Sequence, residues 1–373
     1  MNTQWYDSID DIGAARIAPL EGSPVDFSYG LLRAMERSLW GDVRVRYLAV
    51  EEGSTLLGFF PVYFGTNIEF MAAMPGPIAR SYAALVEHLG LTMAYRVAVA
   101  GSLISDRGFI PLLADCDGAA VVDRIIAGID ELAAAEKLHL AFVKDVHQDF
   151  PAIDRFRAAD FVECYSLPTV RVDTHFASEK DYIASLTANG RSHARRTLKK
   201  IAKDYTIRYI ADYAEYIPKV FPLFRATYLK AQFKLEEPPP QFFLECARVS
   251  PPASELMLCE RDGAIAGAFL ILFHGGQQLN KRVGIDYSRD DSPLIYNALN
   301  YHCLLRAIER GVPLSYLGQT TYTPKLRMGG RLEDQFLFIK GYRFSVRLSL
   351  PLQRLWMLRF RASGITRAVK EGA

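Results

Sequence analysis

The stretch "ELMLCERDGAIAGAFLILFHG", from Glu255 to Gly275, repeats the design of an earlier stretch, "VRYLAVEEGSTLLGFFPVYFG", from Val45 to Gly65. In each, a β-rich run meets a charged turn that contains glycine, and a more apolar run with an early glycine follows. This pattern is typical of a β-hairpin whose second strand is central in its sheet. Two such stretches in one chain predict two units of the same design.

The segments around the two hairpins also match. Apolar residues recur at helical spacing before each hairpin, over Asp26–Leu39 and Ile217–Phe233. A helix and then a strand are predicted after each hairpin, over Val121–Asp145 and Tyr296–Gln319. Each half is therefore expected to run helix, hairpin, helix and strand, and the first half carries an additional stretch at about 66–115.

The composition is that of a globular protein with no overall bias toward nucleic acid. The 373 residues are enough for about two domains, and the formal net charge of +2 means that a polyanion would have to meet a local patch. Five scattered cysteines, none in a CxxC pair, are expected to be reduced thiols.

No targeting or cofactor motif stands out. The N-terminus lacks an apolar signal core and the longest clear apolar run, Ile265–Phe273, is too short to span a bilayer, so we expect a cytoplasmic chain without a transmembrane segment. The sequence has no HExxH motif, His/Cys cluster, Walker loop or GxGxxG, so we expect no metal and no bound ATP or NAD.

Three stretches of the second half carry a resemblance to a known family. They are "YIASLTANGRSHARRTLKKIAKDY" (Tyr182–Tyr205), "SPLIYNALNYHCLLRAIERGVPLSYLGQTT" (Ser292–Thr321) and "YTPKLRMGG" (Tyr322–Gly330). Together with the order of elements, they resemble the GNAT acyltransferases, and in particular the Fem-like branch, which has two GNAT units in one chain. The chain departs from that pattern at Leu317, where the family often has Asp, and at Pro324, where it has Phe.

The resemblance implies an α/β protein with two tandem GNAT-like domains, each a mixed, mostly antiparallel sheet flanked by helices. We expect an N-terminal domain at 1–170 on the acceptor side, without donor binding of its own, and a C-terminal domain at 171–345 that binds the donor and carries out catalysis. Residues 346–373 alternate basic and apolar side chains. They are predicted to form an amphipathic helix, either packed on the second domain or lying at a membrane interface.

Acyl transfer to an amine needs preorganised donors for the oxyanion and a base for the ammonium proton. The resemblance implies that two central parallel strands diverge near Phe269–Gly275 and Leu314–Gln319, and that the backbone groups freed there hold the donor. Gln319 and Thr320 would then face the reacting carbonyl, and Lys325 would neutralise the charge of the donor. The alternative for this loop is a polar turn with solvated cations.

Two further residues complete the predicted catalytic set. Tyr322 would donate a hydrogen bond or relay a proton. Asp286, where the chain leaves a predicted strand, is a candidate general base, although a surface salt bridge to Arg282 or Arg289 would explain it equally well.

The stretch "RSHARRTLKKIAK" predicts an anion-binding helix. Six of its thirteen residues are Lys or Arg, and no acid appears before Asp204. Arg191, Arg195 and Lys199 share one helical face, and Arg196, Lys200 and Lys203 form a second row beside it. The anion would be the phosphates of CoA, an acyl carrier protein or a tRNA acceptor arm; the alternative is a solvated face. The expected donor-binding residues are Arg191, His193, Arg195, Lys199, Thr320 and Arg327.

The acceptor is expected at a second cluster. Lys281 and Arg282 lie on a predicted strand, and Tyr296 and Asn297 lie in the first turn of the helix that begins near Ser292-Pro293. The free N–H groups of that turn could meet a phosphate or a carboxylate.

These predictions support an N-acyltransferase that moves an acyl group from a thioester, on CoA or a carrier protein, to an amino group of a small metabolite without a covalent enzyme intermediate. The first alternative is a transferase that uses aminoacyl-tRNA. The second is a non-catalytic module that binds an anion. The third is a transferase that acts on lipid or cell-wall precursors, and its only support is the tail. We expect a monomer or homodimer and no DNA partner.

Overall fold

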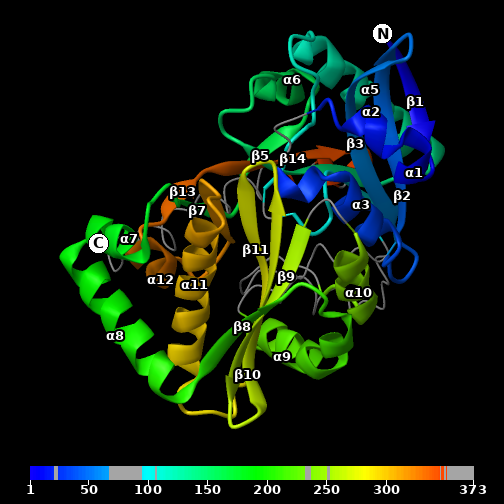
Figure 1. The fold of residues 1–373 in the computed structure, drawn as a ribbon. Helices are drawn as coiled ribbons and strands as arrows, with labels where there is room; N and C mark the ends of the chain where they lie inside the picture. The colour runs from blue at the N-terminus through cyan, green and yellow to red at the C-terminus, as the bar shows by residue number, and fades with distance from the viewer. Residues whose placement is uncertain are drawn as a thin grey trace.

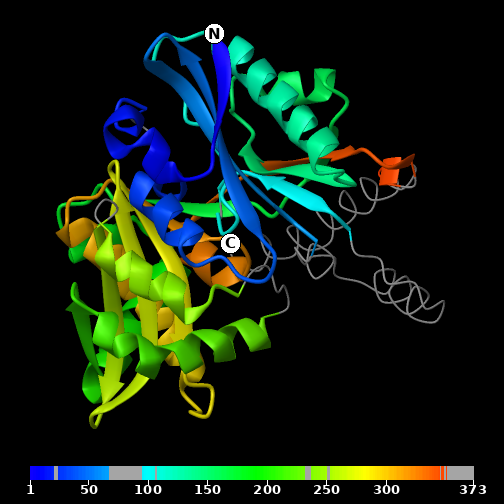
Figure 2. The same ribbon diagram turned by 90° about the vertical axis from the view of Figure 1, so that its right-hand side faces the viewer.

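The chain builds two seven-stranded sheets with helices packed against them (Figures 1 and 2). The computed structural model describes residues 1–20, 24–66, 95–105, 107–231, 237–249, 253–344, 346–347 and 350. The predicted tail at 346–373 therefore lies almost wholly outside the described residues, as does the middle of the additional stretch at 66–115.

The first sheet has the strand order β1-β2-β3-β4-β5-β14-β6. Its strands are β1 (Asn2–Tyr6), β2 (Arg44–Glu52), β3 (Thr55–Gly65), β4 (Val97–Ala100), β5 (Leu140–His147), β6 (Val162–Tyr165) and β14 (Gln335–Gly341). The helices packed with it are α1 (Ile9–Ile12), α2 (Ala14–Ile17), the 3-10 turn η1 (Val25–Phe27), α3 (Tyr29–Glu36), α5 (Gly118–Ala135) and α6 (Ile153–Ala158).

The second sheet has the order β13-β7-β12-β11-β10-β9-β8. Its strands are β7 (Thr169–Asp173), β8 (Thr206–Ile210), β9 (Ala253–Arg261), β10 (Ala264–His274), β11 (Gln277–Ile285), β12 (Leu314–Gly318) and β13 (Arg331–Glu333). Its helices are α7 (Glu179–Ser185), α8 (Ala188–Asp204), the 3-10 turn η3 (Ala214–Tyr216), α9 (Ile217–Lys230), α10 (Pro240–Arg248), α11 (Ser292–Glu309) and α12 (Tyr322–Arg327).

The two sheets follow the same plan, which confirms the predicted repeat. The hairpins β2–β3 and β9–β10 are antiparallel, and each sheet has one parallel pair, β4–β5 or β11–β12. The fold class is therefore the predicted one, with two mixed and mostly antiparallel sheets flanked by helices.

The early glycine in each hairpin allows the following helix to pack closely. A Cβ on Gly58 would lie 2.9 Å from Cγ1 of Val121 in α5. A Cβ on Gly267 would lie 2.9 Å from Cγ2 of Ile295 in α11. Both distances are shorter than real side chains show, so the glycines of the repeat mark equivalent helix–sheet contacts.

The second unit contributes a strand to the first sheet. The short segment after β6 carries the chain into β7, which pairs with β12 and β13 of the second sheet. At the far end of the second unit the chain returns, and β14 enters the first sheet between β5 and β6. In Figure 2 the orange strand β14 lies among the cyan and green strands of the first sheet. Residues 335–341, which the sequence assigns to the second unit, thus pair within the first sheet, because a strand's place is set by its partners and not by its order in the chain.

A continuous core joins the units, together with polar contacts such as the following two. One cluster of buried apolar side chains includes Leu31 and Tyr63 of the first unit together with Phe243 and Leu279 of the second. The ammonium of Lys281, on β11, lies 3.3 Å from the Asp26 carboxylate, and the two side chains are 0% and 3% exposed.

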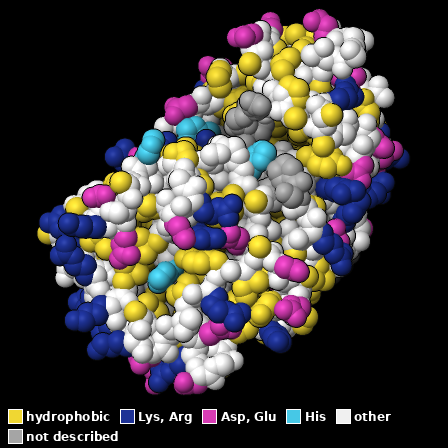
Figure 3. All heavy atoms as spheres, viewed as in Figure 1, with side chains coloured by type: hydrophobic (Ala, Val, Ile, Leu, Met, Phe, Trp, Pro, Cys, Tyr) yellow, Lys and Arg dark blue, Asp and Glu magenta, His cyan; other side chains and the backbone are white. Residues whose placement is uncertain are grey.

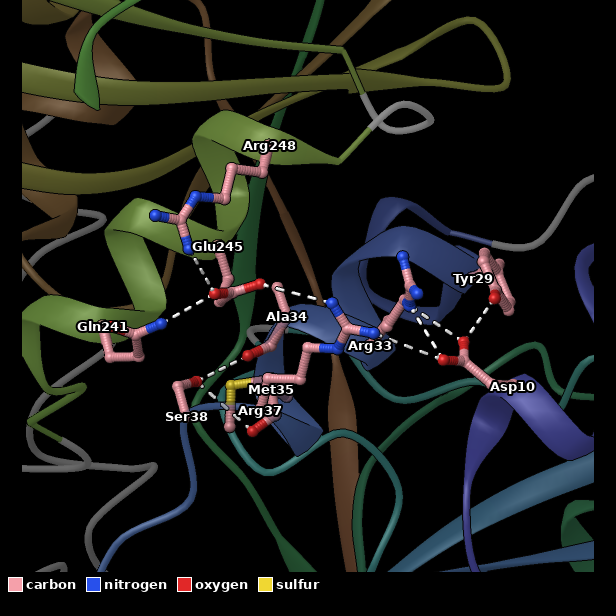
Figure 4. Close-up of polar contacts among 10 residues, drawn as sticks. All are labelled: Asp10, Tyr29, Arg33, Ala34, Met35, Arg37, Ser38, Gln241, Glu245 and Arg248. Carbon is pink, nitrogen blue, oxygen red and sulfur yellow. Dashed lines mark hydrogen bonds and ion pairs between the residues drawn. The ribbon is translucent and has the colours of Figure 1, made fainter.

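The second polar contact lies at the edge of the same interface. Figure 4 shows Arg37 of α3 between Asp10 of the first unit and Glu245 of α10 in the second. The Arg37 guanidinium lies 3.4 Å from the Asp10 carboxylate and 3.9 Å from that of Glu245. Glu245 also accepts hydrogen bonds from Gln241 and Arg248.

Candidate functional site

The strands β11 and β12 part after a short parallel pairing. Gln277–Leu279 pairs with Leu314–Tyr316, and β12 ends at Gly318 while β11 runs on to Ile285. Arg282 and Asn280 pair with Leu270 and Ile271, which are adjacent in β10. Lys281, between them, is therefore the extra residue of a β-bulge. We call the part of β11 beyond Leu279 the strand divergence. The predicted divergence at Phe269–Gly275 is wrong, because β10 is paired on both sides with β9 and β11.

The equivalent position in the first unit is occupied by the chain itself. Beyond the pairing of β4 with β5, Gly108 forms a parallel bridge with Val146 of β5. The Gly108 N–H donates to the Asp145 carbonyl at 2.6 Å, and a Cβ at position 108 would overlap the carbonyl oxygen of Lys144. In the described part of the second unit, no segment fills the corresponding space beside β12.

A left-handed turn follows β12. The φ angles of Gly318, Thr320 and Thr321 are 72°, 60° and 49°. Glycine adopts this conformation freely, but each non-glycine residue in it costs about 1–2 kcal/mol, and a β-branched side chain there is unusual. Contacts around the turn must offset this cost.

The predicted catalytic residues of this loop hold the turn and the chain crossover. Lys325 is buried in α12, and its ammonium donates to the carbonyls of Gly318, at 3.2 Å, and Gln319, at 2.8 Å. The Gln319 amide donates to the Leu167 carbonyl at 2.9 Å, and the Tyr322 hydroxyl donates to the Pro168 carbonyl at 3.1 Å. Gln319, Tyr322 and Lys325 are thus brought together as the sequence predicts, but their polar atoms bind backbone carbonyls.

Tyr296 of α11 reaches the same turn. Burial raises its pKa to about 12, and the neighbouring Thr321 and Asn300 side chains oppose that rise. The hydroxyl therefore stays protonated at neutral pH and can donate a hydrogen bond. Asn297, one residue on, donates to the Pro293 carbonyl at 2.7 Å, and its buried Oδ1 has no partner among the described residues.

The other two predicted acceptor residues lie on β11 at the bulge. Lys281 is enclosed between the units by Asp26 and the carbonyl of Ile104. This places its ammonium out of contact with solvent and favours a structural role over the expected contact with an acceptor. Arg282 is half-buried beside it.

Asp286 forms the local salt bridge that the sequence left open. Its carboxylate accepts hydrogen bonds from the Ser288 side chain at 2.6 Å and from Arg289 at 3.0 Å. The Ser288 hydrogen bond, followed by the Ser288 N–H and Arg289, lowers the pKa of Asp286 despite partial burial. A base of lowered pKa takes a proton poorly at neutral pH, so the geometry gives no support to Asp286 as the general base.

The basic helix α8 exposes its cations. Thr187 caps it by accepting from the Gly190 N–H at 3.2 Å, and its buried face packs beside α11. Figure 3 shows Lys and Arg side chains gathered along the left edge of the molecule, where Figure 1 has α8. A concavity of about 570 Å³ runs along the helix, lined by Ala188, Arg191, Ser192, Arg195, Arg196, Lys199, Lys200 and Lys203.

We call Arg195, Arg196, Lys199, Lys200 and Lys203 the basic face. None of these five side chains forms an ion pair with a described residue. This confirms the exposed position that the sequence predicts for them; their donor-binding role stays a prediction.

The other predicted donor-binding residues lie at the start of α8. Arg191 donates to the Leu186 carbonyl at 2.5 Å, and Nδ1 of His193 lies 3.0 Å from the Tyr301 hydroxyl. Burial and then the charges of Arg327 and Arg196 lower the pKa of His193. A Cβ on Gly190 would lie 2.7 Å from the Arg327 carbonyl oxygen, so α8 and α12 are in direct contact. The structure therefore joins the basic helix to the polar loop after β12.

One polar cluster was missed by the sequence analysis. The Glu333 carboxylate lies 2.9 Å from Arg171, 3.5 Å from His147 and 4.0 Å from Arg107. The guanidinium of Arg107 also lies over the ring of Tyr316, at 4.7 Å. These residues come from both units and are far apart in the chain, so no local spacing could have revealed them.

The described residues contain neither a membrane-spanning helix nor a metal-binding cluster. None of their helices is long and apolar enough to cross a membrane. No three of their His, Cys, Asp or Glu side chains gather as a metal site would require.

Comparisons with known proteins place the architecture. No family model and no curated protein matches the sequence. Among solved structures, FemX aligns with a TM-score of 0.62 at 13% identity, over 94% of this chain and 99% of that one. The C-terminal domain of a putative lysylphosphatidylglycerol synthetase from Agrobacterium fabrum aligns with a TM-score of 0.56 at 14% identity, over 94% and 96%.

A tandem GNAT protein from the clavulanic acid biosynthesis pathway aligns with a TM-score of 0.50 at 11% identity, over 91% of this chain and 98% of that one. At such identities the likeness shows the fold. The predicted resemblance is confirmed at that level, and the chain is a tandem GNAT-fold protein with the two-unit architecture that FemX also has.

Proposed function

We propose that the chain is an N-acyltransferase that moves an acyl group from a thioester donor, on CoA or an acyl carrier protein, to the amino group of a small metabolite. The amine attacks the thioester carbonyl directly, the C–S bond breaks, and the leaving thiolate takes up the proton that the nitrogen loses. The second unit binds the donor and the first unit borders the acceptor. The observation that carries this proposal is the strand divergence between β11 and β12, whose equivalent in the first unit is filled by Gly108.

The residues around the divergence suit the stabilisation of an oxyanion. Beyond Leu279, β11 is paired with β10 on one side only, and its other edge offers backbone N–H and C=O groups to an extended donor arm. The Tyr296 hydroxyl, with its raised pKa, is a neutral donor beside the left-handed turn. A hydrogen bond to the carbonyl oxygen strengthens as negative charge develops there in the transition state.

The charges near α11 and α8 favour one of two places for an anionic donor. The start of α11 follows Asp286, Asp290 and Asp291, and Asp291 is its N-cap residue. These carboxylates would repel a phosphate at that helix end, although its N–H groups alone would attract one. The basic face of α8 carries five exposed cations, and the start of the same helix contacts α12 at Gly190. We therefore assign the phosphates of the donor to α8.

The same basic face favours a second candidate, a transferase that takes an aminoacyl group from aminoacyl-tRNA. Its five cations extend over residues 195–203, about 12 Å of helix at 1.5 Å per residue. A row of that length matches several phosphates of a nucleic acid strand, more than a CoA requires.

Calorimetric titration separates the two candidates. Purified protein is titrated with acetyl-CoA, a phosphopantetheinylated acyl carrier protein and deacylated tRNA, at low and moderate salt. The thioester proposal expects saturable binding of CoA or the carrier at one site per chain. The double variant Arg195→Ala/Lys199→Ala should weaken it about tenfold, at about 0.5–1 kcal/mol for each screened contact.

A matched control tests whether that loss is specific. Lys180, on α7, is an exposed lysine outside the basic face, and Lys180→Ala should leave binding unchanged. Binding of tRNA alone, with a steep dependence on salt, would move the assignment to aminoacyl transfer. Binding of none of the three would remove the support for both.

A further inference from the structure

The turn after β12 combines two features that call for a common explanation. Thr320 and Thr321 are successive β-branched residues, and both have left-handed φ angles, 60° and 49°. Such residues keep this conformation only where the surrounding structure holds them, and they gather at functional sites. The turn lies where β12 ends and α12 begins, with Thr320 half-buried and Thr321 exposed.

Lys325 supplies the constraint on the entry to the turn. Its buried ammonium donates to the carbonyls of Gly318 and Gln319, the two residues that precede the threonine pair. Those bonds fix the peptide planes through which the chain leaves β12. The Gln319 side chain adds an anchor on the Leu167 carbonyl.

The other end of the turn lies near α11. Burial raises the pKa of Tyr296, a residue of α11, to about 12, and the neighbouring Thr321 side chain opposes that rise. A shift of the turn would therefore change the surroundings of the Tyr296 hydroxyl. Lys325 would cause this change through the backbone alone, without any contact between the lysine and a ligand.

We propose that Lys325 is a positioning residue: it holds Thr320 and Thr321 in the left-handed conformation at the end of β12, where that strand parts from β11. This assignment rests on the proposed acyl transfer. It replaces the role expected from the sequence, in which Lys325 neutralises the charge of the donor. A lysine that is buried and bound to two carbonyls has no open face toward such a charge.

A thermal double-mutant cycle tests the constraint without any substrate. The four proteins are wild type, Lys325→Met, Thr320→Gly/Thr321→Gly, and the combined variant. In the wild-type background, Lys325→Met should lower Tm by at least about 4 °C. In the glycine background the same change should cost less than half as much, because glycine adopts the left-handed conformation without a constraint.

Lys281→Met provides the matched control, since it removes another buried ammonium, whose partners Asp26 and the Ile104 carbonyl do not belong to the turn. Its effect on Tm should be the same in both backgrounds. Equal losses for Lys325→Met in the two backgrounds would overturn the proposal. If Lys325→Met does not fold, Lys325→Gln takes its place in the cycle, because its amide keeps one donor for a carbonyl and the same comparison applies.

Kinetics on the folded variants supply the functional readout. For a positioning residue, loss of Lys325 should lower kcat about tenfold or more and leave the donor KM within about twofold. A raised donor KM with unchanged kcat would mean that Lys325 meets the donor, and would overturn the proposal. If wild type transfers no acyl group from any donor, the proposed function fails while the thermal cycle still decides what Lys325 holds.

Discussion

The ammonium groups of Lys144 and Lys281 donate to adjacent carbonyls of one loop, those of Leu103 and Ile104. Lys144 belongs to β5 in the first unit and Lys281 to β11 in the second. The loop after β4 is therefore held from both sides, and it forms the wall of the first unit that faces the strand divergence. The bulge in β11 makes this possible, because an extra residue turns Lys281 toward the first unit.

The ion pair of Lys281 with Asp26 should be a strong tie between the units. Lys281→Met or Asp26→Asn alone leaves a buried group without its partner, and each should cost about 3–5 kcal/mol of unfolding free energy. The double variant should cost clearly less than the sum of the two. Denaturant unfolding of the four proteins measures this, and strict additivity would show that the pair is not energetically coupled.

Gly108 should be intolerant of a side chain. The Cβ of Gly108→Ala would overlap the Lys144 carbonyl, and the backbone there can move only by breaking the Gly108–Asp145 hydrogen bond. We expect a loss of at least about 2 kcal/mol, in the range of other overpacking changes. Gly118→Ala is the control, because its nearest neighbour is the flexible end of Leu112. A thermal melt of both variants makes the comparison; equal stability would mean that the segment at 108 is loosely held.

Tyr296→Phe should slow catalysis without weakening donor binding. Removal of one hydrogen-bond donor to a developing oxyanion lowers kcat about 10²-fold. Because the pKa of Tyr296 is about 12, the hydroxyl stays protonated and its contribution should be constant from pH 6 to about pH 10. Tyr301→Phe, on the same helix but bonded to His193, should leave kcat nearly unchanged. Steady-state kinetics with saturating donor tests both variants.

Glu333 should contribute to stability at neutral pH and lose that contribution in acid. Burial alone would raise its pKa, but His147, 3.5 Å away, and the charges of Arg107 and Arg171 lower it below the ordinary 4.5. A carboxyl with a lowered folded pKa stabilises the protein above its unfolded pKa, and this stabilisation disappears as the pH falls through the folded value.

The variant Glu333→Gln isolates that carboxyl. It should be less stable than wild type at pH 7, and the two should converge as the pH approaches 3. Thermal melts across this range provide the data, and a difference in Tm that does not change with pH would argue against the ionic role of Glu333.

The sequence predicted those parts of the molecule that depend on local pattern. The hairpins, the helices α9 and α11 and the exposed rows of α8 follow from periodicity within one segment, and they are where the pattern put them. The polar loop also lies at the end of a central strand, as expected.

What the sequence did not reveal depends on partners far along the chain. In the sequence, Lys281 and Lys325 both resemble exposed cations. In the structure, the bulge in β11 brings Lys281 to Asp26, and α12 places the ammonium of Lys325 on the carbonyls at the end of β12. In the same way nothing in "QFLFIKG" distinguishes an edge strand of the second sheet from an inner strand of the first. Long-range pairing decided all three.

The entry of β14 into the first sheet makes the first half depend on the second. A cut in the segment between β6 and β7 would give an N-terminal fragment with a vacancy between β5 and β6, and a C-terminal fragment that still carries the missing piece. The C-terminal fragment keeps all seven strands of the second sheet, β7 to β13, whereas the N-terminal fragment lacks an inner strand of the first. The N-terminal fragment should therefore be insoluble or misassembled when produced alone, and soluble when the two fragments are produced together. The design is visible twice in the sequence, yet the dependence runs one way, because the first half is completed by a strand that the chain makes last.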